Sequence, residues 1–225
     1  MSDAATPAPL DPLEPFERRV LGVLAEKSQT SKSADGYPMT LNSVVLGCNQ
    51  KSNRDPVYDL TEDDVEETLE ALAEKGLTMK QVSGRADRWK HQMYDRWGFT
   101  RAEMAVVAEL LLRGPQTLGD LRGRASRMTD IADMDALKGY LNGLIARGFV
   151  VPLMPLDRRG AAVTHAFHPA DEMDQVKAQH GGGTAPDPAP RGGGLATLEA
   201  RLNEAFEEIA KLKEAVARLE RRSGE

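Results

Sequence analysis

Few side chains in this sequence have the chemistry that a catalytic nucleophile requires. A nucleophile works beside a base that accepts its proton, yet Cys48 is the only cysteine and none of the four histidines lies near it in the sequence. Apolar residues 44–46 precede Cys48 in a segment that the pattern predicts as a short helix. We therefore expect Cys48 to be a small buried side chain, and we predict no catalytic site and no enzyme activity.

The histidine pair His165 and His168 is the first candidate for a metal site. The sequence places both on one strand, where side chains three positions apart point to opposite faces of the sheet. No cysteine or carboxylate cluster completes a ligand set of the kind that holds zinc, and the glycine spacing of a nucleotide-phosphate loop is not found. We predict no metal and no cofactor.

Cationic side chains are the remaining candidates for a functional surface. Lysine and arginine neutralise phosphates, and a guanidinium can grip a phosphate or carboxylate with two parallel hydrogen bonds. The predicted contacts to nucleic acid or another anion are Lys51, Arg54, Arg85, Arg88, Lys90, Arg122, Arg124, Arg127, Arg158 and Arg159. For the polar segment 49–55 a second interpretation stays open, in which its side chains cap helix ends and satisfy loop backbone.

The charge balance differs between the two halves of the chain. The whole sequence has a net charge of −6. Residues 10–97 carry 12 Lys and Arg against 16 Asp and Glu, whereas residues 98–177 carry 10 of each. Since affinity for DNA comes largely from neutralising phosphates, the second half is the less repulsive one for a polyanion.

An internal repeat predicts how these side chains are positioned. Leu69-x-x-Leu72-x-x-x-Gly-Leu77 is matched 72 residues later by Leu141-x-x-Leu144-x-x-x-Gly-Phe149. Each string is typical of an amphipathic helix that ends at a left-handed glycine and continues directly into a strand. Finding the same string twice indicates two domains of one kind.

Each half contains the signals for three helices followed by a hairpin. Long helices are predicted at 14–27 and 101–113, short second helices begin at Thr40 and Thr117, and hairpins span 77–94 and 149–168. This order is that of a winged helix, a helix-turn-helix variant. The predicted fold class is mostly α with small β-hairpin wings (α+β), with a disordered segment at 1–9 and winged-helix domains at 10–97 and 98–177.

The amino-acid composition of residues 178–222 differs from that of the two halves. Residues 178–194 are rich in Gly and Pro and predict a flexible linker. Residues 195–222 predict a coiled-coil helix, and the chain is expected to self-associate through Leu195, Leu198, Leu202, Ala205, Ile209, Leu212, Val216 and Leu219. The alternative is one amphipathic helix that docks on the chain's own globular part.

The predicted third helix of the first half is acidic, and its charge separates two hypotheses for the function, DNA binding and protein binding. It carries Glu62, Asp63, Asp64, Glu66, Glu67, Glu70 and Glu74 against Lys75. A surface of this charge is repelled by phosphates. The leading hypothesis is therefore a non-enzymatic, DNA-associated or transcription-regulatory protein that binds through the arginines of the second domain and through the wings. The alternative function is a protein-interaction adaptor whose acidic third helix binds a basic protein surface without binding DNA.

Neither end of the sequence predicts a membrane association. Residues 1–9 lack the cationic start and apolar run of a signal peptide, and no segment approaches the roughly 18 apolar residues of a spanning helix. We expect a cytoplasmic protein.

Several long strings resemble one known family. They are Glu-Arg-Arg-Val-Leu-Gly-Val-Leu-Ala-Glu-Lys at 17–27, Tyr-Pro-Met-Thr-Leu-Asn-Ser at 37–43, the polar run at 48–57, and the segments 110–117 and 121–128. The chain resembles the YceH-like family of uncharacterised bacterial proteins over about residues 10–170. The resemblance implies a tandem winged-helix fold and supplies no activity.

Overall fold

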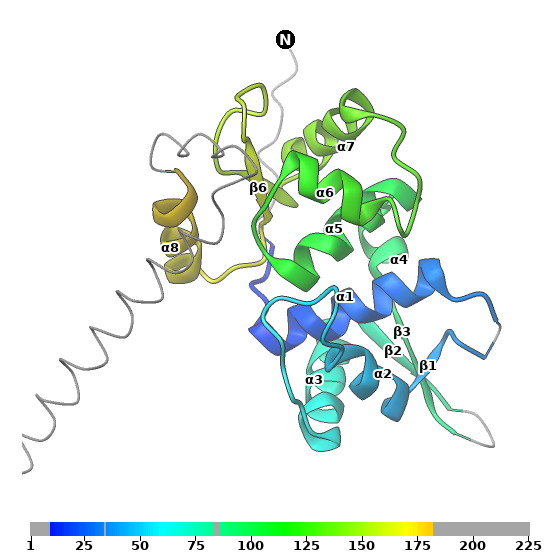
Figure 1. The fold of residues 1–225 in the computed structure, drawn as a ribbon. Helices are drawn as coiled ribbons and strands as arrows, with labels where there is room; N and C mark the ends of the chain where they lie inside the picture. Colours follow the sequence, from blue (N-terminus) through cyan, green and yellow to red (C-terminus); the bar gives the residue numbers. More distant parts are fainter. Residues whose placement is uncertain (1–9, 34, 83–85, 182–225) are drawn as a thin grey trace, which may run out of the picture. The chain divides into compact units, whose positions relative to one another are not determined.

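Each half of the chain combines three helices with a small antiparallel sheet in the computed structural model (Figure 1). The structure describes residues 10–33, 35–82 and 86–181. The predicted coiled-coil residues 195–222 and Arg85 lie outside these ranges, so self-association through the tail stays a prediction.

The first half consists of one set of elements: α1 (Pro15–Thr30), β1 (Met39–Thr40), α2 (Leu41–Cys48), α3 (Glu62–Glu74), β2 (Thr78–Gln81) and β3 (Arg88–His91). The strands form a sheet in the order β1-β3-β2. Met39 pairs with Trp89, and Thr78 pairs with His91.

The second half repeats this order: α5 (Arg101–Arg113), β4 (Gln116–Thr117), α6 (Leu118–Ala125), α7 (Met134–Ala146), β5 (Val150–Pro152) and β6 (Ala162–His165). Its sheet order is β4-β6-β5. A short helix, α4 (Met93–Trp97), joins the halves, and α8 (Ala170–Gly181) follows the second. The predicted α+β class is confirmed.

Local sequence signals explain where the helices begin and end. Thr61 with Asp64, and Thr100 with Glu103, form capping boxes at the starts of α3 and α5. Gly76 and Gly148 end the third helices with φ of 68° and 78°, a backbone conformation that glycine adopts without steric cost. The predicted repeat is therefore visible in matching helix ends.

The predicted strands were longer than those observed, and some elements carried no sequence signal. β3 ends at His91 because the His91 Nδ1 accepts a hydrogen bond from the Met93 amide at 3.2 Å, where the chain turns into α4. The two-residue strands β1 and β4 are too short to show the alternation that identifies a strand. Both add a third strand to a predicted hairpin.

The long helices α1 and α5 pack together at the centre of the described residues (Figure 1). One continuous cluster of buried side chains includes Leu21 and Leu24 of α1 together with Met104, Leu110 and Leu112 of α5. The boundary predicted between residues 97 and 98 separates the repeated elements, but both halves belong to one compact unit with one core.

An ion pair in each half ties the first helix to the third. Lys75 at the end of α3 contacts Glu17 of α1 at 2.7 Å, and Arg147 at the end of α7 contacts Glu103 of α5 at 3.2 Å. Both glutamates are third residues of their helices and belong to the capping boxes. The two halves thus repeat a tertiary contact as well as an order of elements.

Within the described residues, we find no helix that combines the length and apolar character needed to cross a bilayer.

The close approach of α1 to α5 depends on Gly22. A Cβ there would lie 3.0 Å from two side-chain carbons of Leu112. We expect Gly22→Val to lower the free energy of unfolding by about 1–3 kcal/mol through overpacking, measured by urea denaturation. Gly139→Ala is the matched control, because a Cβ at this site in α7 meets no atom within 4 Å and alanine favours a helix by up to about 1 kcal/mol. Equal stability changes in the two variants would contradict the packing argument.

Candidate functional site

Four of the predicted cations lie in three separate parts of the chain. Lys51 is exposed in the α2–α3 connection, and Arg158 and Arg159 are exposed in the β5–β6 connection. Lys90 is partly exposed on β3. None of these side chains forms an ion pair or hydrogen bond with another part of the described chain. They remain candidates for anion contacts, but the structure does not gather them on one element.

Three other predicted cations hold loops in place. Arg88 donates to the backbone oxygens of Asp35 and Pro38 at 2.8 and 2.9 Å. Arg122 donates to the carbonyls of residues 131 and 132 at 3.2 and 3.1 Å, and Arg124 donates to Gln116 Oε1 at 2.7 Å. Part of their hydrogen-bonding capacity is therefore already used.

Arg54 and Arg127 are committed to a buried charge network that links the two halves. Arg54 is fully buried, and its Nη2 lies 2.6 Å from Glu26 Oε2 of α1. Arg127, which follows α6, binds Glu26 Oε1 through Nη1 and Glu109 Oε2 of α5 through Nη2, the latter at 2.9 Å. Neither guanidinium is presented to solvent as a free group, so neither is available for the predicted contact with a phosphate.

The network stabilises the charge of Glu26 more than that of Glu109. Burial raises the pKa of Glu26, but hydrogen bonding and ion pairing with Arg54 and Arg127 outweigh burial and hold the pKa below its ordinary value. For Glu109, burial dominates and raises the pKa despite the contact with Arg127. Glu26 is therefore the fixed negative charge around which the arginines are arranged.

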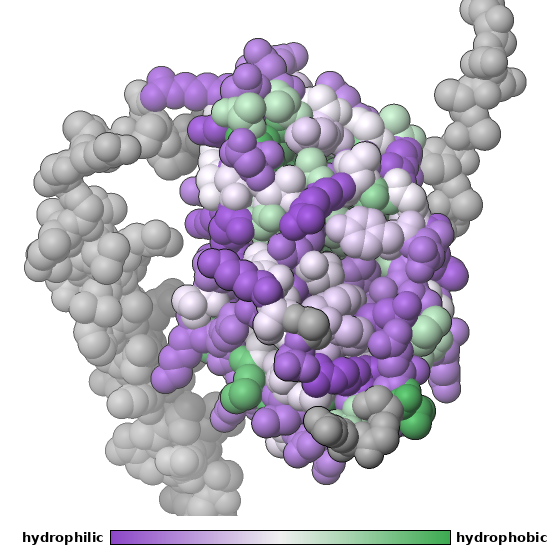
Figure 2. Space-filling model, turned by 90° about the vertical axis from the view of Figure 1, so that its right-hand side faces the viewer, coloured by the Kyte–Doolittle hydropathy of each residue, from purple (hydrophilic) through white to green (hydrophobic). Residues whose placement is uncertain are grey.

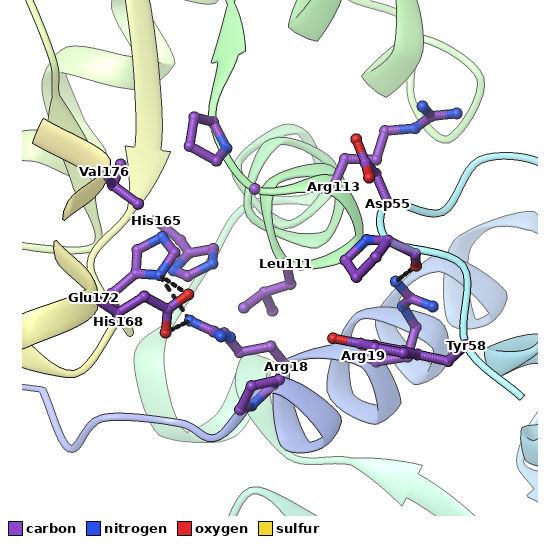
Figure 3. A pocket seen from close by; sticks show the side chains of 14 residues that line it. Arg18, Arg19, Asp55, Tyr58, Leu111, Arg113, His165, His168, Glu172 and Val176 are labelled. Carbon is purple, nitrogen blue, oxygen red and sulfur yellow. Dashed lines mark hydrogen bonds and ion pairs between the residues drawn. The ribbon is translucent and has the colours of Figure 1, made fainter. Parts of the chain in front are cut away.

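A pocket of about 230 Å³ opens where both halves meet α8 (Figure 3). We call it the arginine pocket. Its lining residues are Pro15, Arg18, Arg19, Asp55, Pro56, Tyr58, Leu111, Arg113, Gly114, Pro115, His165, His168, Glu172 and Val176. They come from α1, the α2–α3 connection, the end of α5, the end of β6 and α8.

One wall of the arginine pocket is a cluster of Arg18, His165, His168 and Glu172 (Figure 3). Arg18 Nη1 lies 2.7 Å from His168 Nδ1 and 2.8 Å from Glu172 Oε2. The expectation that His165 and His168 point to opposite faces of a strand is wrong, because β6 ends at His165 and the two rings stack with centroids 3.9 Å apart. Burial lowers the pKa of both imidazoles, which favours their neutral forms.

The opposite wall contains Arg19, which is 2 % exposed. Its guanidinium donates to the backbone oxygens of Cys48 at 3.0 Å and Pro56 at 2.6 Å, and lies 4.5 Å from the centroid of the Tyr58 ring. Its Nε has no hydrogen-bond partner, and no carboxylate lies within ion-pair distance among the described residues. Sequence reasoning missed this residue because an arginine in an amphipathic helix is usually solvated.

Cys48 is buried as predicted, with no measurable exposed surface. Burial raises the pKa of its thiol to about 12, so the thiol stays protonated near neutral pH and is a poor nucleophile. Among the described residues there is also no group of three or more histidine, cysteine or acidic side chains arranged to hold a metal ion.

The outer face of α3 carries exposed acidic side chains beside an apolar hollow of about 510 Å³. The hollow is lined by Glu14, Pro15, Phe16, Glu17, Asp64, Glu67, Thr68 and Ala71. Phe16 is 39 % exposed and packs edge-on against Tyr58. The face of the protein drawn in Figure 2 is mostly hydrophilic, and its apolar areas are small and scattered.

The fold and the site define a class: an α+β protein in which two copies of one helix and strand order share a core and enclose an arginine-lined pocket. A family model described as "Protein of unknown function, DUF480" matches residues 13–160. The chain belongs to this family, and the resemblance inferred from the sequence is confirmed.

Similar chains occur in several bacteria under the name UPF0502 protein. One from Rhodopirellula baltica is 41% identical over 186 residues, covering 80% of this chain and 77% of its own. One from Pseudomonas syringae pv. tomato is 39% identical over 212 residues, covering 92% of both chains. One from Pseudomonas fluorescens (strain SBW25) is 36% identical over 220 residues, covering 97% of both.

The buried network predicts a large stability loss when its central charge is removed. We expect Glu26→Gln to lower the free energy of unfolding by about 3–5 kcal/mol, because the variant leaves Arg54 buried without its counter-charge. Urea denaturation followed by circular dichroism measures the change. Glu70→Gln on the exposed face of α3 is the control and should change stability by less than about 0.5 kcal/mol. A small effect of Glu26→Gln would show that the network is not structural.

The neutral histidines predict a loss of stability in mild acid. Burial lowers the pKa of His91 to about 4, with Asp95 raising it and Lys90 lowering it, whereas an unfolded histidine titrates near 6.5. Between these values the unfolded chain binds more protons, so stability falls as pH falls, by up to about 1.4 kcal/mol per pH unit for one group. Urea denaturation at pH 7 and pH 5 measures this difference.

Asparagine at position 91 should reduce that pH dependence, because its side-chain oxygen can accept the Met93 amide without titrating. His180→Asn is the control, since His180 is exposed on α8. A pH 7 to pH 5 difference that is unchanged in His91→Asn would assign the acid sensitivity to other groups.

Proposed function

We propose that this chain is a non-enzymatic, tandem winged-helix protein that binds a cationic segment of another protein through the acidic face of α3. The observation that carries the proposal is the combination of exposed, unpaired carboxylates on α3 with the apolar hollow beside Phe16.

The arrangement of elements supports the winged-helix part of the proposal. In each half, a short helix and a longer third helix (α2 and α3, α6 and α7) are followed directly by a hairpin. The third helix of such a domain is the element that usually enters the major groove of DNA. In the first half that helix offers negative charge, which is unsuited to phosphates and suited to lysine and arginine.

The acidic residues of α3 form a stripe. Asp63, Glu67, Glu70 and Glu74 are exposed at spacings of four, three and four residues, which places them on one side of a helix. None of them forms an ion pair with another described residue. Like charges at such spacings each cost a few tenths of a kcal/mol, and Glu70 and Glu74 also lie toward the negative end of the helix dipole. A cationic partner would relieve this repulsion.

The hollow beside the stripe supplies an apolar contact. Pro15, Phe16 and Ala71 line it together with acidic side chains at its edge. Interfaces gain most of their affinity from a few buried apolar anchors surrounded by a polar rim. The matching partner is therefore a segment that presents an apolar side chain flanked by lysine or arginine.

DNA binding is the competing function. It would rest on Lys51, Lys90, Arg158 and Arg159, which keep unpaired cationic groups. Their separation on different elements, together with the internal roles of Arg54 and Arg127, makes them the weaker support.

A binding experiment with three full-length proteins separates the two functions. Wild type, a Glu67→Lys/Glu70→Lys variant and an Asp171→Lys/Asp174→Lys control are compared, the control having the same charge change on exposed residues of α8. Partners are captured from nuclease-treated bacterial lysate, purified, and titrated directly against each protein. We expect wild type and control to bind the same partner and the α3 variant to lose at least tenfold in affinity.

The same three proteins are titrated with random duplex DNA at about 50 mM salt by fluorescence anisotropy, because contacts to phosphates bind most tightly at low salt. DNA binding by wild type without any α3-dependent protein partner would replace the proposed function with the nucleic-acid one. A partner that binds the α3 variant as tightly as wild type would also overturn it.

A further inference from the structure

The arginine pocket contains a buried arginine, Arg19, that has no carboxylate within ion-pair distance among the described residues. Arg19 donates to two backbone oxygens and stacks on Tyr58. Carbonyl dipoles satisfy hydrogen bonds but supply no net negative charge. Burial lowers the pKa of Arg19 and the nearby Arg54 lowers it further, while the carboxylate of Asp55 offsets only part of this shift. A buried charge in this state is costly unless an anion pairs with it.

Two further guanidinium groups line the same space. Arg18 uses only its Nη1 in the contacts with His168 and Glu172. Arg113 contacts Glu109 at 3.2 Å and Asn53 at 3.4 Å through Nε and Nη2. The remaining donors of Arg18 have no partner among the described residues, so they can donate into the pocket, whereas the guanidinium of Arg113 is directed away from Arg18 and Arg19 (Figure 3).

The balance of charge in the lining favours an anion. The three arginines of the lining outnumber its two carboxylates. Arg113 is already paired with Glu109, which lies outside the lining, and one of the two carboxylates, Glu172, is paired with Arg18. The other, Asp55, is exposed at the rim. His165 and His168 are held neutral by burial and therefore add no charge of either sign.

The volume limits the size of the ligand. About 230 Å³ exceeds the share of several water molecules, each of which takes roughly 30 Å³ in the liquid. A planar guanidinium fork matches the oxygen spacing of a carboxylate or a phosphate. The ligand class that fits is a small molecule with one or two such groups.

We propose that the arginine pocket is a binding site for a small carboxylate or phosphate ligand, held by Arg18 and Arg19. Because the pocket is lined from both halves of the chain and from α8, a bound anion bridges elements that are far apart in the sequence. The ligand therefore stabilises the contact between the halves as well as neutralising Arg19. This site is separate from the outer face of α3 and does not depend on the function proposed for that face.

Titration calorimetry of the full-length protein with inorganic phosphate and, separately, with succinate tests the proposal at constant ionic strength set with chloride. We expect saturable binding of one ligand per chain for at least one probe, and a rise in melting temperature with ligand concentration. Phosphate binding without succinate binding assigns the site to phosphate ligands, and the reverse result assigns it to carboxylates.

Matched variants show whether the pocket is responsible. Arg18→Gln should weaken binding at least tenfold, whereas Arg96→Gln, at an exposed arginine of α4 outside the pocket, should bind as wild type does. Circular dichroism confirms that each variant is folded, and Arg19→Lys gives a second measurement that keeps a positive charge but removes the fork.

Two results would overturn the proposal. One is a lack of saturable binding for both probes up to about 10 mM, a concentration at which even weak specific sites are occupied. The other is equal weakening in Arg96→Gln and in the pocket variants, which would show a general anion effect.

Discussion

The described structure depends on the packing of α1 against α5 and on the charge that this packing encloses. Glu26 lies in this interface with almost no exposure, between Arg54 of the first half and Arg127 of the second. A buried ion pair contributes little net stability compared with an apolar contact, but it is specific, because any other alignment leaves a charge unpaired. The network therefore fixes how one half is placed on the other, which the apolar core alone would allow to vary.

Internal pairing also limits which cations remain for a partner. Arginines that a reader of the sequence would assign to a phosphate-binding surface bind carbonyls and carboxylates of the same chain, as Arg122 and Arg127 do. Asp63, Glu67, Glu70 and Glu74 of α3 show the opposite behaviour, since they are exposed and have no ion-pair partner among the described residues. Net charge and residue counts could not reveal which charges are paired inside the protein, since they do not distinguish a paired charge from a free one.

The sequence predicted the features that depend on local interactions. The capping boxes at Thr61 and Thr100 and the left-handed glycines at 76 and 148 are decided within one or two turns, and all are present. The strand β1 and the arginine pocket depend on contacts between distant segments, which spacing does not encode. A signal for the buried network did exist, since Glu109 stands within the otherwise apolar run from 104 to 112, and a charge in such a run implies a buried partner.

Three consecutive residues on one turn of α1 hold three different parts of the protein. Glu17 binds the end of α3 through Lys75, Arg18 binds α8 through Glu172, and Arg19 binds the α2–α3 connection through its backbone oxygens. A shift of this turn by a fraction of an ångström would change the hydrogen-bond and ion-pair distances at all three places. The outer face of α3 and the lining of the pocket are thus mechanically joined through a single helical turn, and neither surface can be remodelled by substitution there without disturbing the other.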